Sequence, residues 1–100
     1  MMPKFEDRYA DGYEAELLCP KCDGNYLHHE QVEVFECGED AKTGVHIVVG
    51  EGKATVDTSL DGNPSSRRHG LKIRFRCEQC GAKPLMSISQ HKGNTYFDVC

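Results

Sequence analysis

The chain has 100 residues, 38% of them hydrophobic, and a formal net charge of −4 at pH 7. This length suits one domain with a modest core, and no apolar run approaches the roughly 20 residues that cross a bilayer. The polar N-terminus lacks the apolar stretch of a signal peptide. We therefore expect a cytoplasmic protein with no membrane partner. Because the chain is acidic, it has no general attraction to nucleic acid, and any such binding needs a local patch.

Residues 1–18 form a polar, acidic N-terminal segment before the first cysteine. Aromatic or apolar residues recur there at every fourth position. They are Phe5, Tyr9, Tyr13 and Leu17. This period is compatible with a short helix that carries an aromatic stripe, although Gly12 weakens the helix. A loosely ordered lead-in to the domain is the alternative, and the sequence does not choose between the two.

Residues 19–100 are predicted to form a single β domain. Its candidate strands are rich in β-branched and aromatic residues and are separated by turn-forming residues. They cover residues 26–37, 45–49, 53–57, 71–76, 85–89 and 95–99. Residues 59–70 lack apolar periodicity, which is typical of an exposed loop. The pattern predicts a mostly β fold, with an antiparallel sheet of five or six short strands and little helix.

Two cysteine pairs, each with two intervening residues, lie near the two ends of this domain. They are Cys19-Pro-Lys-Cys22 and Cys77-Glu-Gln-Cys80. A short turn with this spacing directs both sulfurs at a single ion, so two such turns supply four soft ligands for a tetrahedral zinc site. Structural sites of this kind are closed and leave no open position for a substrate. We predict one structural Zn²⁺ that ties residue 19 to residue 80.

Other uses of the thiols fit the spacing less well. Three disulfides would require an oxidising compartment, and a thioredoxin-like redox pair needs a βαβ setting. Iron in a rubredoxin-like site uses the same four sulfurs, but in shorter chains with more aromatic residues around the metal. Cys37 and Cys100 have no partner at this spacing, and we interpret them as a buried small side chain and a terminal thiol. The histidines are scattered along the sequence, so a second metal site would require distant histidines to come together in the folded chain.

The four cysteines, with Gly81 after the second pair, resemble the zinc-ribbon class, in which two C-x-x-C knuckles cap β-hairpins and share one ion. Residues 23–76 place 54 residues between the knuckles, so the resemblance implies an expanded ribbon with three or four inserted strands. Residues 63–80 and 91–96 are also similar to small uncharacterised zinc-ribbon proteins of bacterial phages and mobile elements, which implies no known activity. Ribbons serve transcription factors, ribosomal proteins, nucleases and adaptors alike, so the knuckles predict a metal and not a function.

A cluster of basic residues is unusual in this acidic chain. It consists of Arg67, Arg68, Lys72, Arg74 and Arg76, with no acidic residue among them. Cations on a loop and on one face of a strand could follow a phosphate backbone. The competing interpretation is structural, because acidic residues between positions 30 and 40 could pair with these cations across neighbouring strands.

No nucleophile elbow, phosphate-binding loop or metalloprotease motif occurs in the sequence. We therefore expect a non-catalytic protein with no small-molecule substrate. The first hypothesis is an accessory module of transcription or replication that contacts nucleic acid through residues 67–76. The alternative is a protein-interaction adaptor with a purely structural zinc site, which would use an exposed strand edge or the acidic N-terminal segment.

Overall fold

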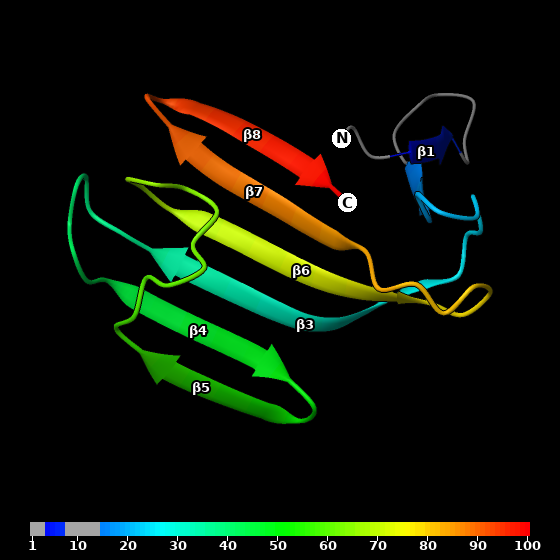
Figure 1. The fold of residues 1–100 in the computed structure, drawn as a ribbon, viewed down its shortest axis with the longest axis horizontal. Helices are drawn as coiled ribbons and strands as arrows, with labels where there is room; N and C mark the ends of the chain where they lie inside the picture. The colour runs from blue at the N-terminus through cyan, green and yellow to red at the C-terminus, as the bar shows by residue number, and fades with distance from the viewer. Residues whose placement is uncertain (1–3, 8–14) are drawn as a thin grey trace.

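The computed structural model describes residues 4–7 and 15–100, and its regular structure in these ranges consists of β-strands. Six strands form one antiparallel sheet in the order β5-β4-β3-β6-β7-β8 (Figure 1). They are β3 (Leu27–Glu36), β4 (Val45–Gly50), β5 (Lys53–Asp57), β6 (Gly70–Cys77), β7 (Leu85–His91) and β8 (Asn94–Val99). The predicted mostly β fold with a sheet of five or six short strands is confirmed. None of the described residues is helical, so this part of the chain contains no helix that could cross a membrane.

Tight turns of two residues form the hairpins at both edges of the sheet. Glu51 and Gly52 connect β4 to β5, while Lys92 and Gly93 connect β7 to β8, and all four residues have positive φ. Two consecutive positive φ values are typical of type I′ turns, whose twist matches that of the paired strands. The sequence predicted both hairpins because glycine tolerates this conformation without cost.

The N-terminal segment is neither a helix nor a loose lead-in where it is described. β1 (Lys4–Asp7) pairs antiparallel with β2 (Ala15–Leu18), and Phe5 lies opposite Leu17 in the register. The helix expected from the four-residue spacing is therefore wrong. Pairing of the two strands satisfies backbone groups of both segments by hydrogen bonds between them, which a helix would satisfy within one segment. Tyr9 and Tyr13 lie outside the described residues.

One face of the six-stranded sheet is apolar. Residues that are paired across neighbouring strands share a face, so the register defines rows that cross the sheet from β5 to β8. One row reads Val56, Ile47, Val34, Leu71, Ile88 and Phe97. The adjacent row on the same side reads Ala54, Val49, Val32, Ile73, Met86 and Val99. We call these two rows the apolar face.

The opposite, polar face is partly covered by the loop between β5 and β6. A side chain at Gly70 would come within 2.7 Å of Pro64, so the missing Cβ lets the loop lie directly on the sheet. Beside it, Phe35 is only 1% exposed and stacks on His46 with ring centroids 4.4 Å apart. The ring of Phe35 also has the ammonium of Lys72 at 5.7 Å from its centroid, a contact of the cation–π type.

Few side chains are fully buried among the described residues. Those with hydrophobic character are Cys19, Phe35, Cys37, Cys77 and Val99, each at most 2% exposed. Three of these five are cysteines, and only Val99 belongs to the apolar face. Burial of apolar side chains between two layers, the usual source of domain stability, is therefore small in this sheet.

The ionic contacts of His46 give the sheet a pH-dependent stability. Burial lowers the pKa of His46, but hydrogen bonds to Asp57 (3.0 Å) and Glu33 (3.1 Å) outweigh it and raise the pKa above 6.5. Because the pKa of His46 is higher in the folded state than in the unfolded state, protonation of His46 stabilises the fold. This contribution is complete below the unfolded-state pKa, and it is lost as the pH rises through the folded-state pKa. We expect the free energy of unfolding to fall as the pH rises above about 6.5.

The measurement is urea unfolding, followed by circular dichroism, of the native chain and of His46→Phe at several pH values. Phenylalanine keeps a ring on Phe35 but cannot titrate, so His46→Phe should lose this part of the pH dependence. Other titrating groups, including the cysteines, contribute equally to both proteins. An identical pH dependence in the two proteins would contradict the assignment.

Candidate metal centre

The structure brings the four predicted cysteine ligands together. The sulfurs of Cys19 and Cys80 lie 3.7 Å apart, those of Cys22 and Cys77 lie 3.6 Å apart, and all four lie within 4.8 Å of one another. In a regular tetrahedron with Zn–S bonds of about 2.3 Å, neighbouring sulfurs are separated by about 3.8 Å. The observed separations therefore fit one tetrahedral ion, and they are far longer than the roughly 2.05 Å of a disulfide bond. These four cysteines could hold one metal ion, and an all-thiolate set is a common structural zinc site.

The two cysteine pairs adopt the same local turn. In each, the residue after the second cysteine has positive φ and donates its backbone N–H to the carbonyl of the first cysteine. Asp23 (φ 61°) donates to Cys19 at 2.9 Å, and Gly81 (φ 74°) donates to Cys77 at 3.0 Å. This repeated geometry turns both sulfurs of a pair toward one point, as the two-residue spacing predicts.

Backbone N–H groups within the turns favour the thiolate form. The N–H groups of Cys80 and Gln79 lower the pKa of Cys77 to about 7. The N–H of Gly24 also lowers the pKa of Cys22, but desolvation and the three neighbouring sulfurs outweigh it and raise that pKa to about 12. Four thiolates at these distances repel one another, so a divalent cation is needed for all four to be deprotonated together.

The centre joins segments that are distant in the sequence. Cys19 and Cys77 are buried, whereas Cys22 and Cys80 are exposed, so solvent and chelators can approach one side of the centre. The second turn also touches the start of β3, where the N–H of Glu78 donates to the carbonyl of Tyr26 at 3.0 Å. A bound ion would fasten the end of β2 to the end of β6 (Figure 1).

The two remaining cysteines differ from the candidate ligands. Cys37 is 2% exposed, and its thiol donates to the carbonyl of Gly38 at 3.1 Å. Cys100 is exposed. The buried position of Cys37 agrees with the small structural side chain inferred from the sequence.

The three predicted nucleic-acid contacts that lie on β6 are all engaged within the protein. Lys72 lies 3.2 Å from Glu33, and Arg76 lies 3.9 Å from Glu30. Arg74 donates to the carbonyl of Lys83 at 2.8 Å. The contacts of Lys72 and Arg76 match the structural interpretation of the basic strand, in which cations of β6 pair with acids of β3. The five basic residues therefore do not form one free surface.

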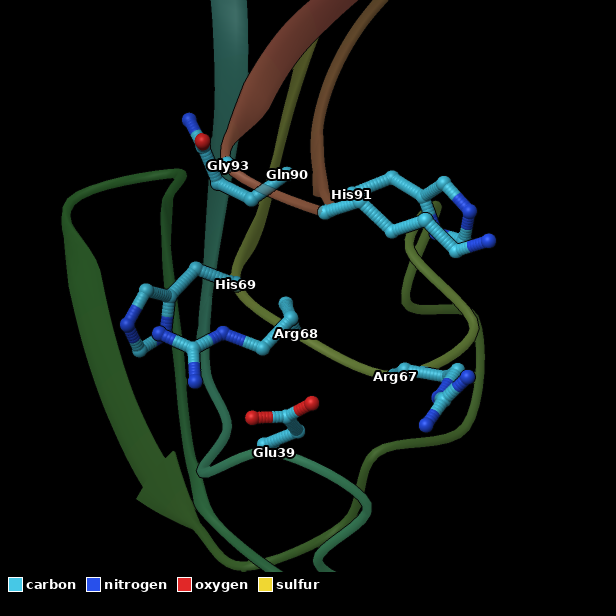
Figure 2. Close-up of a pocket in the computed structure, with 8 residues that line it drawn as sticks. Glu39, Arg67, Arg68, His69, Gln90, His91 and Gly93 are labelled. Carbon is cyan, nitrogen blue, oxygen red and sulfur yellow. The ribbon is translucent and has the colours of Figure 1, made fainter.

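The other two, Arg67 and Arg68, line a cleft of about 740 Å³ at the opposite end of the sheet from the cysteines (Figures 1 and 2). One wall is the loop segment 67–69, and the other is the β7–β8 turn with His91 and Lys92. Glu39 lines the same cleft. The sequence analysis missed the contribution of His91 and Lys92, because only the pairing of Gly70 with Ser89 brings these two segments together.

Buried hydrogen bonds hold the loop wall of the cleft in place. The hydroxyl of Ser65, 6% exposed, donates to the carbonyl of Gln90 at 2.7 Å and accepts the N–H of Arg68 at 3.0 Å. The side-chain amide of Asn63 donates to the carbonyl of Arg68 at 2.9 Å. The position of Arg68 is thus fixed through its backbone, which leaves its guanidinium to reach into the cleft.

The polar groups of the cleft have defined roles. His69 accepts the N–H of Cys37 on its Nδ1 at 3.0 Å, so the ring proton lies on Nε2 and can be donated. Arg67 donates two hydrogen bonds to Asp40, at 2.6 and 2.7 Å, which lower the pKa of that carboxyl. No ion pair joins Arg68 to an acid among the described residues, so its charge is available to a ligand.

The four clustered cysteines could form a zinc-ribbon-like site, and the antiparallel sheet is consistent with a small zinc-ribbon-like fold. Comparisons with protein-family models, with curated proteins and with solved structures find no match to this chain. The similarity to phage and mobile-element ribbons therefore gains no support from them. The metal assignment depends on the geometry of the cysteines alone.

We expect one zinc ion per chain by elemental analysis, and loss of β structure by circular dichroism when a chelator removes it. Cys80→Ser should abolish zinc binding and destabilise the fold by several kcal/mol, since zinc ligation provides about 10–16 kcal/mol in small zinc peptides. Cys100→Ser is the matched control, because both cysteines are exposed but only Cys80 belongs to the centre. A metal-free chain that keeps its fold would contradict the assignment.

Proposed function

We propose that the protein is a non-catalytic accessory module, stabilised by zinc, that contacts nucleic acid through the cleft between segments 67–69 and 90–93. The observation that supports this function is the presence of Arg67, Arg68 and Lys92 in the lining of one cleft. The chain carries a net charge of −4, so a local concentration of cations is unlike the rest of the molecule. Transcription or replication complexes are the setting that we propose for such a module.

The donors of the cleft suit a phosphate backbone. Phosphate oxygens accept hydrogen bonds and are recognised mainly by arginine, lysine and other polar donors. Arg68 and Lys92 supply charge from the two walls, and the Nε2 proton of His69 supplies a further donor. Arg67 can share its guanidinium between Asp40 and a ligand, because it is 47% exposed.

Glu39 sets a limit on how a nucleic acid could lie in the cleft. A carboxylate repels phosphate, but it accepts hydrogen bonds from amino groups of bases. The phosphates should therefore follow the Arg68 and Lys92 side, with a base or sugar above Glu39. This arrangement favours a single strand, whose bases are free to turn toward the protein.

The test is titration of fluorescently labelled single-stranded DNA, RNA and duplex DNA at low and moderate salt. Three phosphate contacts predict a drop in single-strand affinity of roughly 20-fold between about 50 and 200 mM salt. Arg68→Glu/Lys92→Glu should reduce binding at least about tenfold through loss of these contacts. The control Lys53→Glu/Lys83→Glu has the same net charge but alters residues outside the cleft.

Zinc content and circular dichroism are measured for each variant, so that loss of binding can be separated from loss of fold. Absence of binding by the native chain at low salt would refute the function. Equal losses in both double variants would show that net charge, and not the cleft, controls binding.

A protein-interaction adaptor remains the second candidate function, and one observation favours it. The apolar face contains several strongly exposed side chains, among them Val56 (69%) and Val49 (49%). Exposed apolar surface of this kind is typical of protein contacts. The contact would use the face of the sheet and not the strand edge or the N-terminal segment that the sequence suggested.

A further inference from the structure

The apolar face is open over most of the six-stranded sheet, and Val99 on β8 is its one fully buried residue. Among its residues, Val34 is 38% exposed, Phe97 is 45% exposed and Val56 is 69% exposed. The extensive contacts of the described strands are with their neighbours within each sheet, and the β5–β6 loop lies against Gly70 on the polar face. No described strand forms a second layer over this face.

The exposed area is large for a monomer of this size. The chain exposes 6792 Å², whereas a compact monomer of 11.2 kDa is expected to expose about 5,700 Å². This excess is distributed over the whole chain, and it is large enough to accommodate the roughly 800 Å² that each partner buries in a standard stable interface.

We propose that the second layer is another copy of this chain. Two sheets pack with their apolar faces together as a β-sandwich, related by a twofold axis that runs parallel to the strands between β3 and β6. In this arrangement β3 lies over β6 of the other copy, β4 over β7, and β5 over β8. The proposal concerns the apolar face only, and it does not depend on nucleic-acid binding in the cleft.

The size of the side chains on the two halves of the face favours a second copy. The half formed by β5, β4 and β3 carries mainly smaller residues: Ala54, Val56, Ile47, Val49, Val32 and Val34. The half formed by β6, β7 and β8 carries mainly larger ones: Leu71, Ile73, Met86, Ile88, Phe97 and Val99. The twofold axis places the small half of each copy on the large half of the other.

The register keeps these pairs at equal height along the strands. A twofold rotation about an axis parallel to the strands does not shift any residue in the strand direction. Each row therefore lies over the same row of the other copy. Val34 would therefore lie over Leu71 of the other copy, and Val56 over Phe97. Large residues opposite small ones fill the space between two sheets about 10 Å apart without voids.

The distribution of charge also permits self-association through this surface. Neither row of the apolar face contains an ionisable residue. Glu33, Asp57 and Asp98 lie in the register positions of the polar face, whereas Glu36 lies on the apolar side, one row beyond Val34 at the end of the face. Two copies can thus meet without bringing like charges together at the centre, and interfaces of permanent homodimers are apolar in this way.

The first experiment measures the mass of the zinc-loaded protein by light scattering and sedimentation over a range of concentrations. We expect twice the 11.2 kDa of one chain at micromolar concentration. Val34→Lys/Val56→Lys should shift this to a monomer, because it introduces charge into an exposed row of the face. Thr55→Lys/Ser87→Lys is the matched control, since it adds the same charge to a row of the polar face and should remain dimeric.

The second experiment tests the axis, in a Cys100→Ser background with zinc bound. A short bismaleimide should link Val56→Cys/Phe97→Cys into covalent dimers, whereas neither single substitution should link to itself. Should Val34→Lys/Val56→Lys fail to fold, the single Val56→Lys change at the most exposed position replaces it and should lower the dimer's affinity at least tenfold. A monomeric native protein, or a dimer that survives these face substitutions, would overturn the proposal.

Discussion

The structure brings four sulfurs from the two ends of the domain to one point, where a single metal ion could hold them. A single-layer sheet buries little, and three of its five most buried hydrophobic residues are cysteines, two of which belong to the centre. Zinc ligation of the kind measured in small peptides, about 10–16 kcal/mol, is comparable to the whole stability of a typical domain, about 5–15 kcal/mol. The ion would therefore supply stability that packing between two layers usually provides, because it would link the end of β2 to the end of β6.

Strand β6 links this centre to the cleft. It ends at Cys77, inside the metal centre, and begins at Gly70, directly after the loop wall of the cleft. Its pairing with β3 places Leu27 beside Cys77 at one end, and its pairing with β7 places Gly70 beside Ser89 at the other. Strand β6 therefore contributes to the cysteine cluster at its end and adjoins the cleft at its start.

Local chemistry explains which features the sequence predicted. The cysteine spacing, the hairpin turns and the alternation in residues 71–76 each depend on neighbouring residues, and each led to the observed element. The interpretation of the N-terminal segment failed because Phe5 and Leu17 satisfy a helical period as well as a hairpin register. The cleft could not be predicted, since Arg68 and Lys92 meet only through strand pairing. The same holds for Lys72, whose partner Glu33 lies on another strand.

The apolar face shows what alternation along a strand can and cannot reveal. Alternating residues in β6 identify the side that avoids water, but they do not identify what covers that side, because a sandwich, a second copy and a partner protein require the same pattern. The arrangement of large and small residues between the two halves of the sheet carries the missing information. In the proposed dimer, a twofold axis along the strands would place the clefts of the two copies at the same end. If each cleft binds nucleic acid as proposed, the dimer would present two linked sites, and binding at one would favour binding at the other.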